Sequence, residues 1–62
     1  MTPAQIRKKC EIARKTGEAY LPSGDCITYY PDTQEYALHS AWKRQTICVT
    51  YKIDYIIKIC SD

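Results

Sequence analysis

The sequence of this 62-residue chain lacks any long apolar run. A helix that crosses a bilayer needs about 18 or more mostly apolar residues in a row, and no segment approaches that length. We therefore expect no membrane span. The chain also begins Met1-Thr2-Pro3, without the apolar segment of a secretion signal.

Signature motifs of common enzyme classes are also absent. The sequence has no G-x-S-x-G, no phosphate-binding P-loop and no cluster of His, Cys and Asp at metal-ligand spacing. His39, the only histidine, would need Glu35 and Arg44 to form a ribonuclease-like set of proton shuttle and phosphate-binding cation. Because that set is a match of composition rather than a motif, we expect a non-catalytic protein without cofactor or metal.

The cysteines lack the close C-x-x-C pairing of zinc fingers and zinc ribbons. A domain of this length buries only about 60% of the surface that its unfolded chain exposes. Natural domains of this size are therefore usually stabilised by disulfides or a bound metal ion. A disulfide that closes a loop of about 15 residues contributes roughly 3 kcal/mol. We expect a single domain over residues 1–62 with two disulfides among four cysteines, which are Cys10, Cys26, Cys48 and Cys60.

Disulfides persist in oxidising compartments, which predicts a secreted, extracellular protein. The missing signal segment leaves two interpretations open. Either a leader has been removed and Met1 was added afterwards, or the protein is intracellular with reduced thiols.

The first seventeen residues predict a helix. Thr2 is suited to the N-cap, Pro3 to the first helical position and Gln5 to the third, which together make a capping box. Gly17 can adopt the positive φ of a helix C-cap. The residues expected to face the core recur at helical spacing and are Ile6, Cys10 and Ala13.

The opposite face of this predicted helix is basic. Residues 1–17 contain five basic residues and one acidic residue, a local charge of +4. Such a helix can attract phosphates or anionic lipid. A solvated face with i,i+4 pairs between Arg7 and Glu11 and between Glu11 and Lys15 explains the same pattern. Nucleic-acid binding is therefore an alternative function and not the main one.

From residue 18 onward the sequence has the character of β-structure. Residues 21–25 read as a turn, residues 26–30 as a strand that Pro31 ends, and residues 34–40 as a weaker strand. Apolar or aromatic residues occupy every odd position from 47 to 59, which is a period of two. Because strands seldom run so long, we expect a hairpin with its tip at residues 53–55.

That hairpin register would set Cys48 opposite Cys60, within the distance that a disulfide needs. The pairing would leave Cys10 to bond Cys26 and to tie the helix to the first strand. A single long bent strand is the alternative, with Cys10 and Cys26 bonded to the two C-terminal cysteines.

The stretch GDCITYYP resembles the Asp-Cys-x-x-Tyr-Tyr segment of peritrophin-A type chitin-binding modules, through Asp25, Cys26, Tyr29 and Tyr30. The resemblance covers about half of the chain and implies a chitin- or glycan-binding module. It also implies a cysteine before this segment and a late hairpin closed by a disulfide, at positions compatible with Cys10, Cys48 and Cys60.

The stretch SAWKRQT sets the only tryptophan, Trp42, against Lys43 and Arg44. If residues 40–45 connect two strands, an indole and two cations share one loop, and Trp, Tyr and Arg are frequent interface anchors. The cation pair would also suit the anionic pocket of a trypsin-like protease. Alternatively, the indole covers the sheet and closes the core. The further residues assigned to this binding site are His39, Tyr29 and Tyr30.

The sequence therefore predicts a small disulfide-rich α+β domain, with an N-terminal helix packed on a three- or four-stranded antiparallel sheet. We expect a secreted binding protein, such as an inhibitor, toxin or effector, whose partner is a protein. A glycan is the second choice of partner, and nucleic acid is the third.

Overall fold

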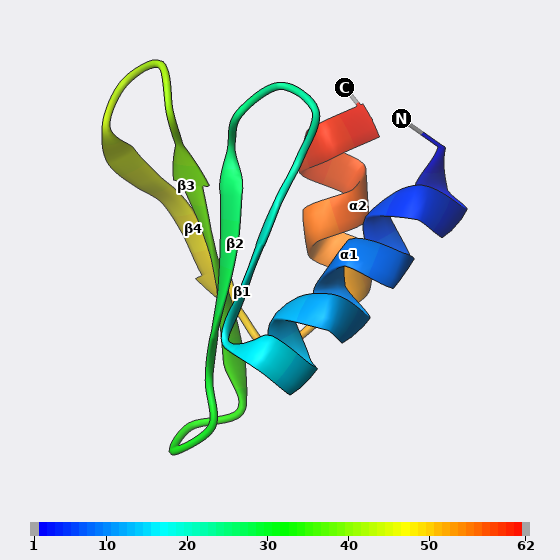
Figure 1. The fold of residues 1–62 in the computed structure, drawn as a ribbon, viewed down its shortest axis with the longest axis vertical. Helices are drawn as coiled ribbons and strands as arrows, with labels where there is room; N and C mark the ends of the chain where they lie inside the picture. The colour runs from blue at the N-terminus through cyan, green and yellow to red at the C-terminus, as the bar shows by residue number, and fades with distance from the viewer. Residues whose placement is uncertain (1, 62) are drawn as a thin grey trace.

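A computed structural model describes residues 2–61, so the origin of Met1 lies outside the described residues. The elements are α1 (Pro3–Thr16), β1 (Glu18–Tyr20), β2 (Cys26–Tyr30), β3 (Glu35–Ser40), β4 (Gln45–Thr50) and α2 (Ile53–Ser61). The four strands form one antiparallel sheet in the order β1-β2-β3-β4. Both helices lie on the same face of the sheet and leave the other face open (Figure 1). The expected α+β architecture with an N-terminal helix on the sheet is confirmed.

Helix α1 begins and ends as the sequence predicts. The Thr2 hydroxyl accepts a hydrogen bond from the Gln5 amide at 3.2 Å, and the Gln5 side-chain oxygen accepts one from the Thr2 amide at 2.9 Å. Gly17 takes φ 100° and donates its N–H to the Ala13 carbonyl at 2.7 Å. The residues that α1 buries are the three expected ones.

The predicted hairpin over residues 47–59 is wrong, and so is the single long strand. Strand β4 ends at Thr50, and a nine-residue helix, α2, follows at Ile53. The odd-position pattern misled because Ile56, at an even position, is fully buried. Read at intervals of three and four, the same segment has a helical apolar stripe formed by Ile53, Ile56, Ile57 and Cys60.

The remaining strand predictions agree with the structure. Strand β2 ends at Tyr30, directly before Pro31, and β3 covers most of the expected residues 34–40. Residues 21–25 form the predicted turn, in which the Gly24 amide donates to the Leu21 carbonyl at 2.9 Å. Adjacent strands are joined in sequence, so both ends of the sheet carry exposed turns.

The core lies between the sheet and the helix pair. Its largest fully buried side chains come from both helices and the two central strands, namely Ile6, Cys10, Ile27, Leu38 and Ile56. Ile27 and Leu38 are cross-strand partners that face the helices. Burial of an aliphatic side chain contributes roughly 1.5–3 kcal/mol, so this layer holds both helices to one face.

All four cysteines are free thiols in the structure. The two expected disulfides are therefore not formed and stay a prediction. The hairpin argument for pairing Cys48 with Cys60 no longer holds, and the late hairpin implied by the peritrophin-A resemblance is absent from residues 47–59. Both cysteines nevertheless pack against the core.

Candidate functional site

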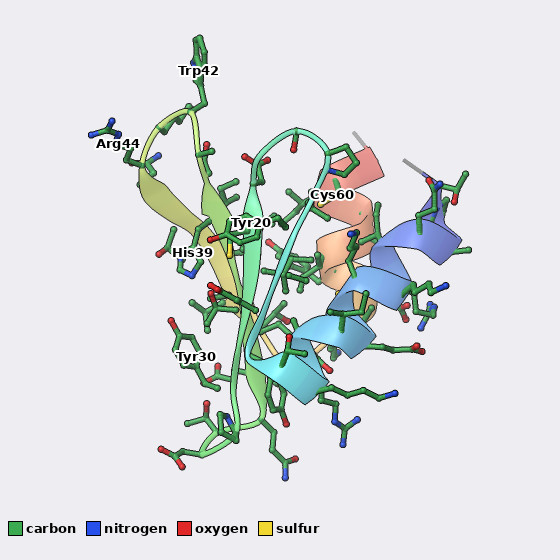
Figure 2. All side chains as sticks on the ribbon, viewed as in Figure 1. Tyr20, Tyr30, His39, Trp42, Arg44 and Cys60 are labelled. Atoms are coloured by element: carbon green, nitrogen blue, oxygen red, sulfur yellow. The ribbon has the colours of Figure 1, made fainter. Side chains whose placement is uncertain are left out.

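Trp42 lies at the tip of the turn between β3 and β4. Its side chain is 92% exposed and projects away from the body of the molecule (Figure 2). The alternative in which the indole closes the core is therefore wrong. Lys43 and Arg44 follow on the same turn and are exposed, so the tryptophan and both cations are presented together.

This turn is fixed by hydrogen bonds to its neighbours. The Ala41 amide donates a hydrogen bond to Asp25 Oδ1 at 3.1 Å. The Lys43 amide donates one to the hydroxyl of the buried Ser40 at 3.1 Å. Asp25 belongs to the β1–β2 turn, so the two turns at this end of the sheet are joined. Arg44 adopts φ 52°, the left-handed region that closes the turn. A turn fixed in this way loses little conformational entropy when it binds.

Beside the tip, the open face of the sheet carries a row of four side chains. The strand register aligns Tyr20, Cys26, His39 and Thr46 across all four strands. Nδ1 of His39 lies 3.0 Å from Oγ1 of Thr46, so the imidazole is held against β4. The predicted His39 thus lies on the surface next to the tip.

Glu35 lies too far from His39 to complete the ribonuclease-like acid–base set considered from the sequence. Glu35 lies four residues earlier on β3, and the rise of about 3.3 Å per residue separates the two Cα atoms by roughly 13 Å. Within the part of the chain that the structure describes, the side-chain partner of His39 is Thr46.

The two predicted tyrosines of β2 lie on opposite faces of the sheet. Tyr30 is exposed on the open face, where Figure 2 shows it toward the end remote from Trp42. Tyr29 faces the helices and packs on Tyr36, with ring centroids 5.0 Å apart and planes inclined at 53°. Tyr29 is therefore not part of the surface that includes the tip.

The sequence interpretation missed two exposed residues on the open face. Tyr20 on β1 is 60% exposed, and Val49 on β4 is 52% exposed. Strand alternation would have located both, because each follows a residue that faces the core, Ala19 before Tyr20 and Cys48 before Val49. Tyr20, Tyr30 and His39 make this face partly aromatic, and Val49 adds an aliphatic side chain.

The cysteines divide between the two faces of the sheet. Sγ of Cys26 lies 3.9 Å from Oγ1 of Thr28 and 4.0 Å from a carboxylate oxygen of Glu18, on the open side. Cys10 is fully buried among residues that face the helices. A Cys10–Cys26 disulfide would therefore require backbone movement, because side chains on opposite faces point apart.

Burial sets the ionisation of the thiols on the helix side. It raises the pKa of Cys10 to about 11, and the nearby Cys60 thiol adds to the effect. Burial also raises the pKa of Cys48 and that of Cys60. Because the thiolate is the reactive form, these three groups are poor nucleophiles near neutral pH.

The basic face of α1 is paired differently from the expected i,i+4 pattern. Arg7 forms a 2.9 Å salt bridge with Asp54 of α2, rather than a bridge with Glu11. Both side chains are more than half exposed, so the bridge contributes at most about 1 kcal/mol. The bridge links the two helices and removes one cation from the basic surface.

The described residues, 2–61, show neither a metal-ligand cluster nor a membrane-spanning helix. Over these residues, His, Cys, Asp and Glu form no group of three or more that would hold a metal ion. Neither described helix has the length and apolarity required to cross a bilayer.

Compared with known proteins, the chain matches no family model, no curated protein and no solved structure.

Proposed function

We propose that this protein is a secreted, non-catalytic binding protein, such as an inhibitor, toxin or effector, that contacts a partner protein through its β3–β4 turn. The observation that carries the proposal is the 92% exposure of Trp42 on a turn fixed by Asp25 and Ser40. Large exposed indoles are costly to hydrate and act as anchors when a partner covers them.

The composition of the turn supports a protein partner. Tryptophan and arginine are enriched among the residues that dominate binding energy, and Lys43 adds a second cation beside them. His39 and Tyr20 lie on the adjoining face and can widen the contact. One side of a standard interface covers about 800 Å², which is roughly 18% of the 4474 Å² surface.

Disulfide formation belongs to the same proposal, since the compartment is inferred from the cysteines. The supporting observation is that Cys48 and Cys60 pack against the core from the same side of the sheet. A bond between them would tie α2 to β4 and would stabilise the scaffold behind the turn.

The test is quantitative capture of a partner from the extracellular fluid of the producing organism, followed by affinity measurement with the purified partner. The double variant Lys43→Ala/Arg44→Ala should bind at least about 30-fold more weakly than the wild-type protein, the equivalent of roughly 2 kcal/mol. Its thermal stability should remain within about 0.5 kcal/mol, as expected for surface changes.

The matched control is Lys8→Ala/Lys15→Ala, which removes two exposed cations from α1 and so lowers the net charge equally. Equal weakening by both double variants would show that overall charge, rather than the turn, drives binding. Retention on chitin beads would favour the glycan-binding alternative. Binding to DNA that falls steeply with salt would favour the nucleic-acid alternative.

A further inference from the structure

A concave surface lies at the end of the sheet remote from Trp42. It is a hollow of about 510 Å³ between the last turn of α1, the β2–β3 turn and the segment that joins β4 to α2. In Figure 1 the β2–β3 turn and the β3–β4 turn occupy opposite ends of the molecule. The hollow is therefore separate from the proposed protein-binding turn.

Three tyrosines form the aromatic part of this hollow. Tyr29 and Tyr36 face each other across β2 and β3, with the inclined ring packing described above. Tyr36 is 5% exposed, whereas Tyr51 is 69% exposed. The aromatic lining thus runs from a buried floor at Tyr36 to an open rim at Tyr51.

Arg14 gives the hollow its charge. Among the described residues that line it, Arg14 is the only charged one, and the others include the polar Thr33 and Gln34. The acidic residues on either side of this turn segment, Asp32 and Glu35, are not part of the lining. The salt bridge in the described part of the chain uses Arg7, so Arg14 has no carboxylate partner there.

Arg14 also lies close to the floor of the hollow. Burial raises the pKa of the Tyr36 hydroxyl, and the Arg14 guanidinium opposes this shift. A positive charge therefore acts on the same space that the tyrosine rings border. Ligand sites commonly have volumes of about 300–1,000 Å³ and a few convergent polar groups within an apolar or aromatic lining.

We propose that this hollow binds a small anion that carries an aromatic ring, either an aromatic phosphate or an aromatic carboxylate. The ring packs against the tyrosines, which favour offset or edge-to-face contact with another aromatic group. The anionic group pairs with Arg14, whose planar guanidinium matches phosphate and carboxylate oxygens. Thr33 and Gln34 supply further hydrogen-bonding groups at the rim.

The test is titration of the ¹⁵N-labelled protein followed by amide chemical shifts, with four probes. Phenyl phosphate and benzoate carry both features, phenol carries the ring alone, and inorganic phosphate carries the charge alone. We expect saturable shifts confined to residues 14, 29, 33–36 and 51–53 with phenyl phosphate, benzoate or both. Phenol and inorganic phosphate should bind at least about tenfold more weakly. The stronger of the first two probes identifies the anionic group.

Two pairs of variants assign the effect to the lining residues. Arg14→Gln should weaken binding of the anionic probe about tenfold, whereas Lys15→Gln, the adjacent cation outside the hollow, should not. Tyr51→Ala should weaken it similarly, whereas Tyr55→Ala, another exposed tyrosine, should not. The proposal is overturned if no probe saturates, if shifts fall outside the hollow, or if Arg14→Gln binds like the wild-type protein.

Discussion

At the scale of single residues, Cys10 shows how burial changes chemistry. Its thiol is fully enclosed, and transfer of a thiolate into that environment is unfavourable. The folded protein therefore favours the neutral thiol, with a pKa raised from 9.0 to about 11. The unfolded chain keeps a pKa near the ordinary value, so folding and ionisation are coupled.

We predict that protein kept reduced loses stability as pH rises from about 9 to about 11. The contribution of the neutral Cys10 thiol is fully present below the unfolded pKa and is lost through the folded pKa, up to about 3 kcal/mol. Denaturant titrations across this pH range measure the loss. Cys10→Ala should lower the stability throughout and make its pH dependence shallower. Part of the dependence should remain, because burial also raises the pKa values of Cys48 and Cys60. An unchanged slope would contradict the prediction.

The candidate surface could be predicted only in part from single residues. Trp42, Lys43 and Arg44 were located because an aromatic residue and two cations separate two strand-like segments. Tyr29 was misplaced because neighbouring residues on a strand point to opposite faces, so it cannot share a surface with Tyr30. Arg14 was missed as a lining residue because only tertiary packing sets a helix end beside two tyrosines.

At the scale of elements, α1 depends on the reciprocal hydrogen bonds between Thr2 and Gln5. We predict that Thr2→Ala costs about 1 kcal/mol, within the usual range of about 0.5–2 kcal/mol for such caps. Thermal or denaturant unfolding measures the change. Thr33→Ala, an exposed threonine in the β2–β3 turn, is the control and should be close to neutral. Equal effects of both substitutions would show that the cap contributes nothing specific.

Substitutions in α2 test whether this segment is a helix, because its sequence pattern suggests a hairpin. Lys58 is exposed in the last turn of α2, so Lys58→Ala should be nearly neutral. Lys58→Pro should cost about 3 kcal/mol or more, because proline removes a helical hydrogen bond and clashes with the preceding turn. Circular dichroism should show loss of helical signal only in the proline variant. Retention of that signal would contradict the assignment of α2.

The contrast between the two helices explains why one was predicted and the other was not. Helix α1 carries local signals at both ends, in Thr2 with Gln5 and in Gly17. Helix α2 follows β4 after only two residues and continues its apolar character, so periods of two and of 3.6 compete within one segment. The burial of Ile56 decides in favour of the helix, and that burial depends on contact with α1 and the sheet.

At the scale of the whole molecule, the oxidation state of the cysteines is the main open prediction. If two disulfides form, the intact mass should rise by about four hydrogens on reduction. Mass spectrometry with and without reductant measures this, and peptide mapping should find Cys48 bonded to Cys60. A rise of two hydrogens together with a mapped Cys48–Cys60 bond would mean that Cys10 and Cys26 remain thiols on their separate faces. An unchanged mass would contradict the proposed secretion.

The position of β4 at the end of the strand order affects how the protein behaves at high concentration. Its residues, QTICVT, contain no charge and no proline, and Ile47 and Val49 are both exposed. An uncharged edge strand of this composition is a template for pairing with strands of other molecules. We predict that agitation of concentrated wild-type protein yields β-rich fibrils, measured by dye binding and electron microscopy. Val49→Lys should suppress them at unchanged thermal stability, and equal fibril yield would exclude β4 as the aggregating edge.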